Sequence, residues 1–363
     1  MSDTWLTPEY WLQLAPQLHI QDDQLLLHAS AFEVQQSLGR TLNELIVREG
    51  YFQIDPPNWG LPLRAMAQAI LTLEQHGWLS VFAFLYDEYW LLYHRLKDVV
   101  AAVLGEEFKI RPDFWAWHVN PSKGESGWPP HRDWDLDGLF PDGRPKTLTI
   151  WIPLTDATPL NGCMYVVPAD RDPTYGTASR DFWRFQQVDI RALPAAAGSV
   201  LCWNSEVIHW GSHSTPRAPQ PRISLALEFQ RGDVPPFNEP LMPNGTVPPF
   251  PLRAKARSAS RCSNGRDIHW RSRRWCLLHS ALLEGVRLSC SDWRQRRTAQ
   301  APSTPSCRAA TALAVPPCAD SKRLGSTAAC PNYASAAHVD EAELSDNLPG
   351  IDRVPAVLRG VAP

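Results

Sequence analysis

A His-x-Asp tripeptide, His131-Arg-Asp133, places two metal-binding side chain types close together in the chain. Residues i and i+2 of an extended segment point to the same side, so this imidazole and this carboxylate can reach one ion. A third candidate, His209, lies 78 residues further on, after the apolar run 199–203. Two histidines and a carboxylate on one face of an octahedron form the usual ligand set of non-haem Fe(II) sites. The pattern therefore predicts a metal site made of His131, Asp133 and His209.

Each of these signals also has an ordinary structural explanation. An isolated His-x-Asp is more often a surface pair, and the chain contains a second one, His338-Val-Asp340, with no histidine after it. A single His209 could equally be a core histidine bonded to backbone. The metal site is preferred because the three residues occur together, in this order and at this spacing.

Arg222 and Ser224 extend the pattern to a possible anion site. Arg222 begins an apolar run 13 residues after His209, and Ser224 shares its strand face by the period of two. An arginine that faces the inside of a barrel is costly without an acidic partner, and its planar guanidinium can hold a carboxylate through two hydrogen bonds. A salt bridge at a sheet edge, for example to Glu228, is the alternative.

The elements that must position these residues change in character along the chain. Residues 38–47, 63–76 and 86–104 have the apolar spacing of helices, and Tyr51–Ile54 is a short strand candidate. From residue 108 onward, short apolar runs alternate with Gly, Pro and Asn turns, which predicts an antiparallel sandwich or barrel. The expected strands are residues 114–119, 147–153, 164–167, 199–203 and 222–229.

Composition excludes several classes of protein. The net charge of −3 gives no sign of nucleic-acid binding. The most apolar window, residues 81–104, is interrupted by charged side chains and does not predict a membrane span. The N-terminus has no basic region followed by an apolar one, so we expect a cytoplasmic protein.

Residues 251–363 differ from the rest of the chain. Residues 1–250 carry 18 Lys and Arg against 29 Asp and Glu, a net charge of −11, whereas residues 251–363 carry a net charge of +8 and six of the eight cysteines. This abrupt change predicts either a disordered tail or a segment outside the native reading frame. The expected organisation is a helical part at 1–107, a β-rich catalytic core at 108–250 and this tail at 251–363.

Several motifs in the β-rich part occur in the order found in one enzyme family. They are His131-Arg-Asp-Trp, Thr149-Ile-Trp-Ile-Pro-Leu-Thr-Asp, Asn161-Gly-Cys-Met-Tyr-Val-Val-Pro, Gly198-Ser-Val-Leu-Cys-Trp-Asn-Ser, His209-Trp-Gly-Ser and Arg222-Ile-Ser. With them, residues from about 38 to 239 resemble the phytanoyl-CoA dioxygenase family of oxygenases that depend on Fe(II) and 2-oxoglutarate.

The resemblance implies a fold, a cosubstrate and a reaction. The fold would be mainly β with helices, a double-stranded β-helix (the cupin-like jelly roll) with the N-terminal helices packed on one face. His131, Asp133 and His209 would bind Fe(II), Arg222 and Ser224 would bind 2-oxoglutarate, and Trp151 would pack near that cosubstrate. The reaction would use O2, with ascorbate as a possible reductant, to hydroxylate a C–H bond of a small molecule and release succinate and CO2.

Two other functions remain open at this stage. A cupin-like metalloenzyme that does not use 2-oxoglutarate would keep the three metal ligands but leave Arg222 without a role. A jelly-roll binding protein with a degenerate site would not need the intact ligands. Five tryptophans near the motifs could wall a substrate pocket or simply pack in the core: Trp115, Trp117, Trp128, Trp134 and Trp210.

Overall fold

Nine strands form the centre of the part of the chain that the structure describes. The computed structural model describes residues 4–27, 31, 33–133, 137–177, 184–244 and 251–264, all of which belong to one compact unit. The strands are β1 (Tyr51–Ile54), β2 (Lys109–Val119), β3 (Thr147–Pro153), β4 (Met164–Val167), β5 (Arg191–Leu193), β6 (Val200–Trp203), β7 (Ile208–Gly211), β8 (Arg222–Gln230) and β9 (Met242–Pro243).

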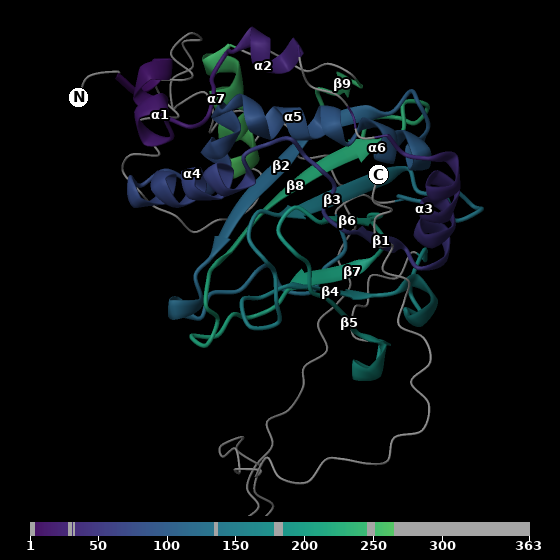
Figure 1. Cartoon of the computed structure of the whole chain (residues 1–363). Coiled ribbons are helices and arrows are strands. Elements are labelled where there is room, and N and C mark those ends of the chain that lie inside the picture. The colour runs from purple at the N-terminus through teal and green to yellow at the C-terminus, as the bar shows by residue number, and fades with distance from the viewer. Residues whose placement is uncertain are drawn as a thin grey trace, which may run out of the picture. The chain divides into compact units, whose positions relative to one another are not determined.

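The strands make two antiparallel sheets. The larger has the order β1-β6-β3-β8-β2-β9 and the smaller the order β5-β4-β7. The small sheet lies on one side of the large sheet, as Figure 1 shows. After β3 the chain crosses repeatedly between the sheets, with β4 and β5 in the small sheet, β6 in the large, β7 in the small and β8 in the large, as in a jelly roll. The predicted double-stranded β-helix is therefore confirmed.

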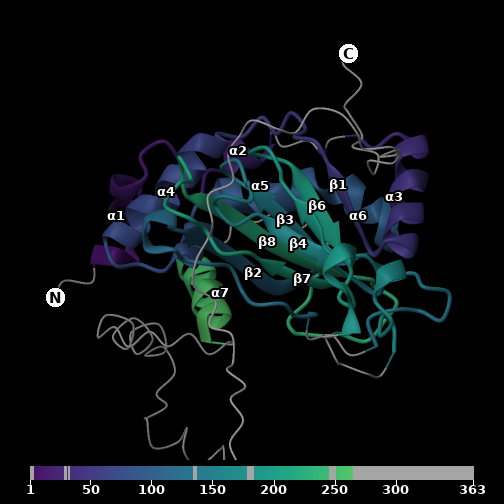
Figure 2. The same cartoon turned by 90° about the horizontal axis from the view of Figure 1, so that it is seen from below.

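Helices cover the other face of the large sheet (Figures 1 and 2). They are α1 (Pro8–Leu14), α2 (Asp23–Leu27), α3 (Gln36–Arg48), α4 (Leu63–Gln75), α5 (Asp87–Arg95), α6 (Lys97–Leu104) and α7 (Leu252–Asn264). The expectation of one helix over residues 86–104 is wrong, because the helix is broken at Leu96 into α5 and α6. The 3-10 segment η2 (Ser80–Leu85) precedes α5 and packs against α4, α7 and β2.

The two central strands are buried on both faces. Every residue of β3 and β8 is buried, since helices cover one face and the small sheet covers the other. Along β8 the apolar side chains of Ile223, Leu225, Leu227 and Phe229 alternate with a second row, which is Arg222, Ser224, Ala226 and Glu228. By the period of two, this second row faces the space between the sheets. The polar side chains of Arg222, Ser224 and Glu228 therefore lie inside an otherwise apolar core.

The beginning of the expected tail is part of the fold. Helix α7 packs against η2, with Leu252, Ala256 and Ala259 buried. Lys255 is also buried, and its ammonium group binds Asp87. The change in composition at residue 250 therefore does not mark a structural boundary, and residues 265–363 lie outside the described residues. None of the helices that the structure describes is long and apolar enough to cross a membrane.

Candidate metal centre

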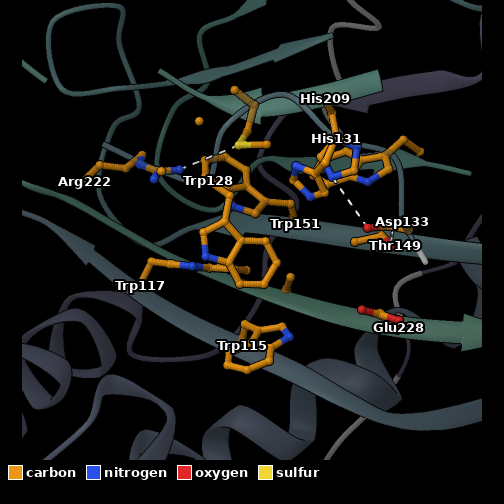
Figure 3. Close-up of a pocket in the computed structure, with 15 residues that line it drawn as sticks. Trp115, Trp117, Trp128, His131, Asp133, Thr149, Trp151, His209, Arg222 and Glu228 are labelled. Atoms are coloured by element: carbon orange, nitrogen blue, oxygen red, sulfur yellow. Dashed lines mark hydrogen bonds and ion pairs between the residues drawn. The ribbon is translucent and has the colours of Figure 1, made fainter. Parts of the chain in front are cut away.

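Three metal-binding side chains converge between the two sheets. The donor atoms of His131, Asp133 and His209 all lie within 4.8 Å of one another (Figure 3). His209 is on β7, whereas His131 and Asp133 lie on the segment between β2 and β3. His131 and His209 form an isolated antiparallel bridge, with the His131 N–H 3.1 Å from the His209 carbonyl and the His209 N–H 2.9 Å from the His131 carbonyl. The backbone itself thus fixes the distance between the two imidazoles.

Both histidines present the same ring nitrogen to the centre of the site. Nδ1 of His131 is 2.8 Å from the carbonyl oxygen of Pro129, and Nδ1 of His209 is 3.0 Å from that of Val207. A carbonyl oxygen only accepts, so each Nδ1 must carry the proton. The Nε2 lone pairs are then left for a metal ion, with the ring orientation set by a backbone contact.

The carboxylate of Asp133 is oriented by one neighbour on β3. The hydroxyl of Thr149 donates to Oδ2 of Asp133 at 2.8 Å, while Oδ1 of Asp133 lies 3.7 Å from Nε2 of His209. Two ligands of one octahedral ion lie about 3 Å apart, given metal–ligand bonds of about 2.1 Å. The N, N, O donor set and its spacing therefore fit a divalent ion such as Fe(II).

The residue between the first two ligands anchors their segment. Arg132 is buried, and its guanidinium forms an ion pair with Asp172 and donates to Oγ1 of Thr174 at 2.8 Å. Its Nε donates to the carbonyl of Glu206 at 2.9 Å. Because Arg132 points away from the two ligands on either side, these contacts lock the segment that carries His131 and Asp133.

The metal-binding side chains line a pocket between the sheets, with about 460 Å³ of empty space that is partly open to solvent. Its wall combines the three candidate ligands with a largely aromatic surface (Figure 3). The lining residues are Trp115, Trp117, Gly127, Trp128, His131, Asp133, Thr149, Trp151, Met164, Trp203, His209, Gly211, Arg222, Ala226 and Glu228.

Arg222 lies at the other end of this pocket from Asp133 (Figure 3). It is 2 % exposed, and no acidic side chain among the described residues forms an ion pair with it. Its guanidinium lies 5.5 Å from the ring centre of Trp151, and its Nη1 is 3.7 Å from Sδ of Met164. Burial lowers the pKa of Arg222 to about 10. A buried guanidinium without an acidic partner is a receptor for a carboxylate ligand.

Two glycines keep space beside this guanidinium. A Cβ atom on Gly127 would lie 3.1 Å from Nη2 of Arg222 and 2.7 Å from the Cα of Gly211. A Cβ atom on Gly211 would also lie 3.1 Å from that Nη2. Since real Cβ atoms seldom approach so closely, the two glycines leave a hollow around Arg222 that any side chain would fill.

The other predicted site residues are placed differently. Trp151 lines the pocket beside Arg222, as expected. Ser224 is fully buried on the same strand face but does not line the pocket, and its hydroxyl has no hydrogen-bond partner among the described residues. Of the five tryptophans, Trp115, Trp117 and Trp128 line the pocket. Trp210 instead stacks on Tyr165, and Trp134 lies outside the described residues.

Sequence reasoning did not assign roles to Thr149, Gly127 or Gly211. Thr149 and Gly211 belong to motifs that carry the family resemblance. Their place in these motifs is the sequence feature that could have indicated a role in the site. No feature of the sequence around Gly127, apart from its turn-rich neighbours, indicated a role for it. Its role depends on the close approach of Gly211, which lies on β7 and is distant in the sequence.

Comparison with known proteins agrees with this geometry. Residues 66–219 match the family model described as phytanoyl-CoA dioxygenase (PhyH). A search of curated protein sequences found no matching relative. The fold and the matched domain together define an oxidoreductase of the Fe(II)- and 2-oxoglutarate-dependent dioxygenase class. The match confirms the predicted resemblance to the phytanoyl-CoA dioxygenase family over residues 66–219.

Solved structures with a similar arrangement were also found. One is the non-heme alpha-ketoglutarate-dependent epimerase SnoN from nogalamycin biosynthesis, at 18% identity over 54% of this chain and 84% of SnoN, with a TM-score of 0.41. Another is the non-heme monooxygenase ThoJ, at 16% identity over 62% of this chain and 100% of ThoJ, with a TM-score of 0.45. A third is EctD from S. alaskensis, at 16% identity over 58% of this chain and 86% of EctD, with a TM-score of 0.42. Likeness at this level assigns neither a reaction nor a substrate.

Proposed function

We propose that this protein binds Fe(II) through His131, Asp133 and His209, and hydroxylates a C–H bond of a small-molecule substrate. The observation that carries the proposal is that one pocket holds both the three metal-binding side chains and the buried, acid-free Arg222. Bound Fe(II) and 2-oxoglutarate would supply, with O2, the oxidising power for hydroxylation, with release of succinate and CO2.

The chain's own residues would bind and orient the reactants. Arg222 would hold the distal carboxylate of 2-oxoglutarate through two charge-assisted hydrogen bonds, in the hollow beside Gly127 and Gly211. Trp151 would cover one side of that cosubstrate, since it already lies against the guanidinium. Ser224 remains a weaker candidate, because its hydroxyl is buried beside this end of the pocket without lining it.

The pocket wall would keep water away from the reacting carbon. Trp203 and Met164 line it together with the tryptophans of β2, so most of the surface near the ligands is apolar. A water-poor site strengthens each electrostatic contact and prevents side reactions of the oxidant. Retention of the Asp133 carboxylate supports hydroxylation over halogenation, in which a halide takes the place of that ligand.

The decisive experiment is 2-oxoglutarate turnover by the full chain. Protein supplied with Fe(II), ascorbate and O2 is assayed for succinate, with His131→Ala and Arg222→Ala as test variants. Succinate that disappears in both variants is the expected result. Iron binding and activity unaffected by Arg222→Ala would favour a cupin-like metalloenzyme that does not use 2-oxoglutarate. Absence of bound iron in anaerobically prepared protein would favour a jelly-roll binding protein and end the proposal.

A further inference from the structure

Arg132 connects the segment of the first two metal ligands to the turn that precedes the third. Nε of Arg132 donates to the carbonyl of Glu206 at 2.9 Å. The next carbonyl along the chain, that of Val207, lies 3.0 Å from Nδ1 of His209 and sets the orientation of its ring. The residue between the first two ligands is therefore bonded to the peptide group next to the one that orients the third ligand.

A buried acidic side chain from another segment holds the guanidinium of Arg132. This segment follows β4, the strand that pairs with β7 in the small sheet (Figure 1). Asp172 forms an ion pair with Nη2 of Arg132, and Oγ1 of Thr174 accepts from the same nitrogen at 2.8 Å. Thr174 also donates to the other oxygen of Asp172, through its backbone N–H at 2.9 Å and its hydroxyl at 2.8 Å. The side chains of Arg132 and Asp172 are each 1% exposed, so water competes little for these contacts.

The same segment also contacts the turn before His209 directly. Nδ2 of Asn204 donates to the hydroxyl of Tyr175 at 2.7 Å, and Oδ1 of Asn204 accepts from the backbone N–H of Glu206 at 3.0 Å. Asn204 and Glu206 are both buried. Two contacts, one through Arg132 and one through Tyr175, thus fix this turn relative to the segment after β4.

The backbone bridge between the two ligand histidines does not fix the third ligand. It joins His131 to His209 but does not extend to Asp133, which lies two residues further along the chain. A metal site needs its ligands within roughly 0.5 Å of the productive geometry, and contacts outside the ligand set supply this precision. The contacts of Arg132 hold the stretch between His131 and Asp133 against the turn before His209, which the bridge alone does not do.

From these contacts we infer that Arg132, Asp172 and Thr174 form a clamp that positions all three metal ligands relative to one another. Arg132 is then a positioning residue, which acts on the metal ion through the segments that it joins and is more than a counter-ion for Asp172. This inference rests on the proposed function, because the metal ion that the clamp serves is the one that the proposed function requires.

The variant Arg132→Lys separates the charge of the side chain from its shape. Lysine can still pair with Asp172, but its compact ammonium group lacks the planar fork that reaches the Glu206 carbonyl and the Thr174 hydroxyl together. Affinity for Co(II), measured on the full chain by competition with a chelator, should fall by about 10- to 100-fold. The visible absorption bands of bound Co(II), which report the geometry of its ligands, should also shift. Wild-type affinity with an unchanged spectrum would overturn the inference.

A pair of double variants separates positioning from general stability. Arg132→Met/Asp172→Asn removes both charges together, so neither is left buried without its partner. The matched control is Lys255→Met/Asp87→Asn, which removes another fully buried ion pair, outside the pocket. Co(II) affinity should fall by about 10- to 100-fold in the first variant and stay unchanged in the second, with folding of both checked by circular dichroism. The same Co(II) affinity in the two variants would mean that the clamp does not position the ligands.

The wild type distinguishes this inference from the proposed function. Calorimetry on the full chain records the stoichiometry of Co(II) binding and the subsequent binding of 2-oxoglutarate, and we expect one equivalent of each. If the wild type binds both and the clamp variants match it, the inference is wrong and the proposed function stands. If the wild type binds no divalent metal ion, the proposed function fails and the inference fails with it.

Discussion

His131 and His209, 78 residues apart in the chain, exchange both of their backbone hydrogen bonds. This bridge joins the segment before β3 to β7, and the two imidazole centres lie 4.3 Å apart. Each ring is further held by its own contact from Nδ1 to a carbonyl two residues earlier. The two nitrogen donors are thus positioned before any metal binds, which reduces the reorganisation that binding requires.

The first prediction follows from this arrangement. His209→Ala removes one donor of three and should abolish stoichiometric iron binding, measured by metal analysis after anaerobic dialysis against Fe(II). The matched control is His76→Ala, because His76 is exposed and lies outside the pocket. Full iron occupancy in His209→Ala would exclude His209 as a ligand.

Thr149→Val tests the orientation of the carboxylate. Valine keeps the volume of threonine but cannot donate to Oδ2 of Asp133, so metal affinity should fall by about 10- to 100-fold. Thr147→Val is a closely matched control, since Thr147 is on the same strand and its buried hydroxyl has no hydrogen-bond partner among the described residues. Competition with a chelator measures both affinities. Equal losses in the two variants would mean that the Thr149 hydroxyl does not act on the metal site.

Gly211→Ala tests the hollow beside Arg222. The added methyl group would lie 3.1 Å from the guanidinium and 2.9 Å from the Cα of Gly127, so it would occupy the space for a carboxylate. Binding of 2-oxoglutarate should fall by at least about tenfold, while metal binding persists. In Gly124→Ala the new Cβ has no neighbour within 4 Å, and the strain of an alanine at its positive φ of 63° lies outside the residues that line the pocket, so stability should fall while cosubstrate affinity stays unchanged. Calorimetric titration of both variants with 2-oxoglutarate decides the point.

Local patterns in the sequence were sufficient for much of the fold. The helix at Gln36–Arg48 and the strand at Arg222–Gln230 carry clear periods of 3.6 and two, and each forms where expected. The break at Leu96 was missed because the apolar pattern continues across it without Gly or Pro. The strand Arg191–Leu193 has only three residues and is defined by its pairing with β4. This strand was not predicted, because a local sequence pattern does not show pairing with a distant segment.

The residues of the candidate site likewise fall into those that the sequence predicted and those that it did not. His131, Asp133 and His209 were predictable because residue type and order alone indicate metal binding. The Thr149 contact and the Gly127–Gly211 approach depend on pairs of segments that meet only in the folded chain. Lys255 shows the same limit, because its partner Asp87 lies 168 residues away and composition gives no sign of it.

Stability should depend on pH through His19 and Glu88. Nδ1 of His19 lies 2.6 Å from Glu88, and this hydrogen bond raises the pKa of His19, while burial raises the pKa of Glu88. In both cases the folded chain binds the proton more tightly than the unfolded chain, so the free energy of unfolding falls as pH rises. For His19 the stabilisation is complete below its ordinary pKa of 6.5 and is lost as pH rises through the raised value.

Urea unfolding of His19→Gln over this pH range measures the histidine's contribution. The variant should lose the part of the pH dependence above pH 6.5, and the exposed His76→Gln should retain it. An unchanged profile in His19→Gln would assign the pH dependence to other groups.

The last prediction concerns the attachment of α7 to the oxygenase fold. Lys255 is fully buried, and its ammonium group binds Asp87 and donates to the carbonyl of Leu85 at 3.2 Å. Lys255→Met would leave the Asp87 carboxylate buried without its cation, which should lower the free energy of unfolding by about 3–5 kcal/mol. In the double variant Asp87→Asn/Lys255→Met both charges are gone, so we expect a smaller loss than the single change causes. Arg253→Met, at an exposed position of the same helix, is the control.

Truncation also tests the attachment of α7. It removes the whole helix and does not alter single members of the buried ion pair. A chain that ends after residue 264 keeps α7 and should unfold at a clearly higher temperature than one that ends after residue 250, which lacks the whole helix. The shorter chain also exposes the apolar surface of η2 that Leu252, Ala256 and Ala259 cover. Equal melting temperatures would mean that α7 contributes nothing to stability. In that case the oxygenase domain would end near residue 250, where the charge and composition of the chain change.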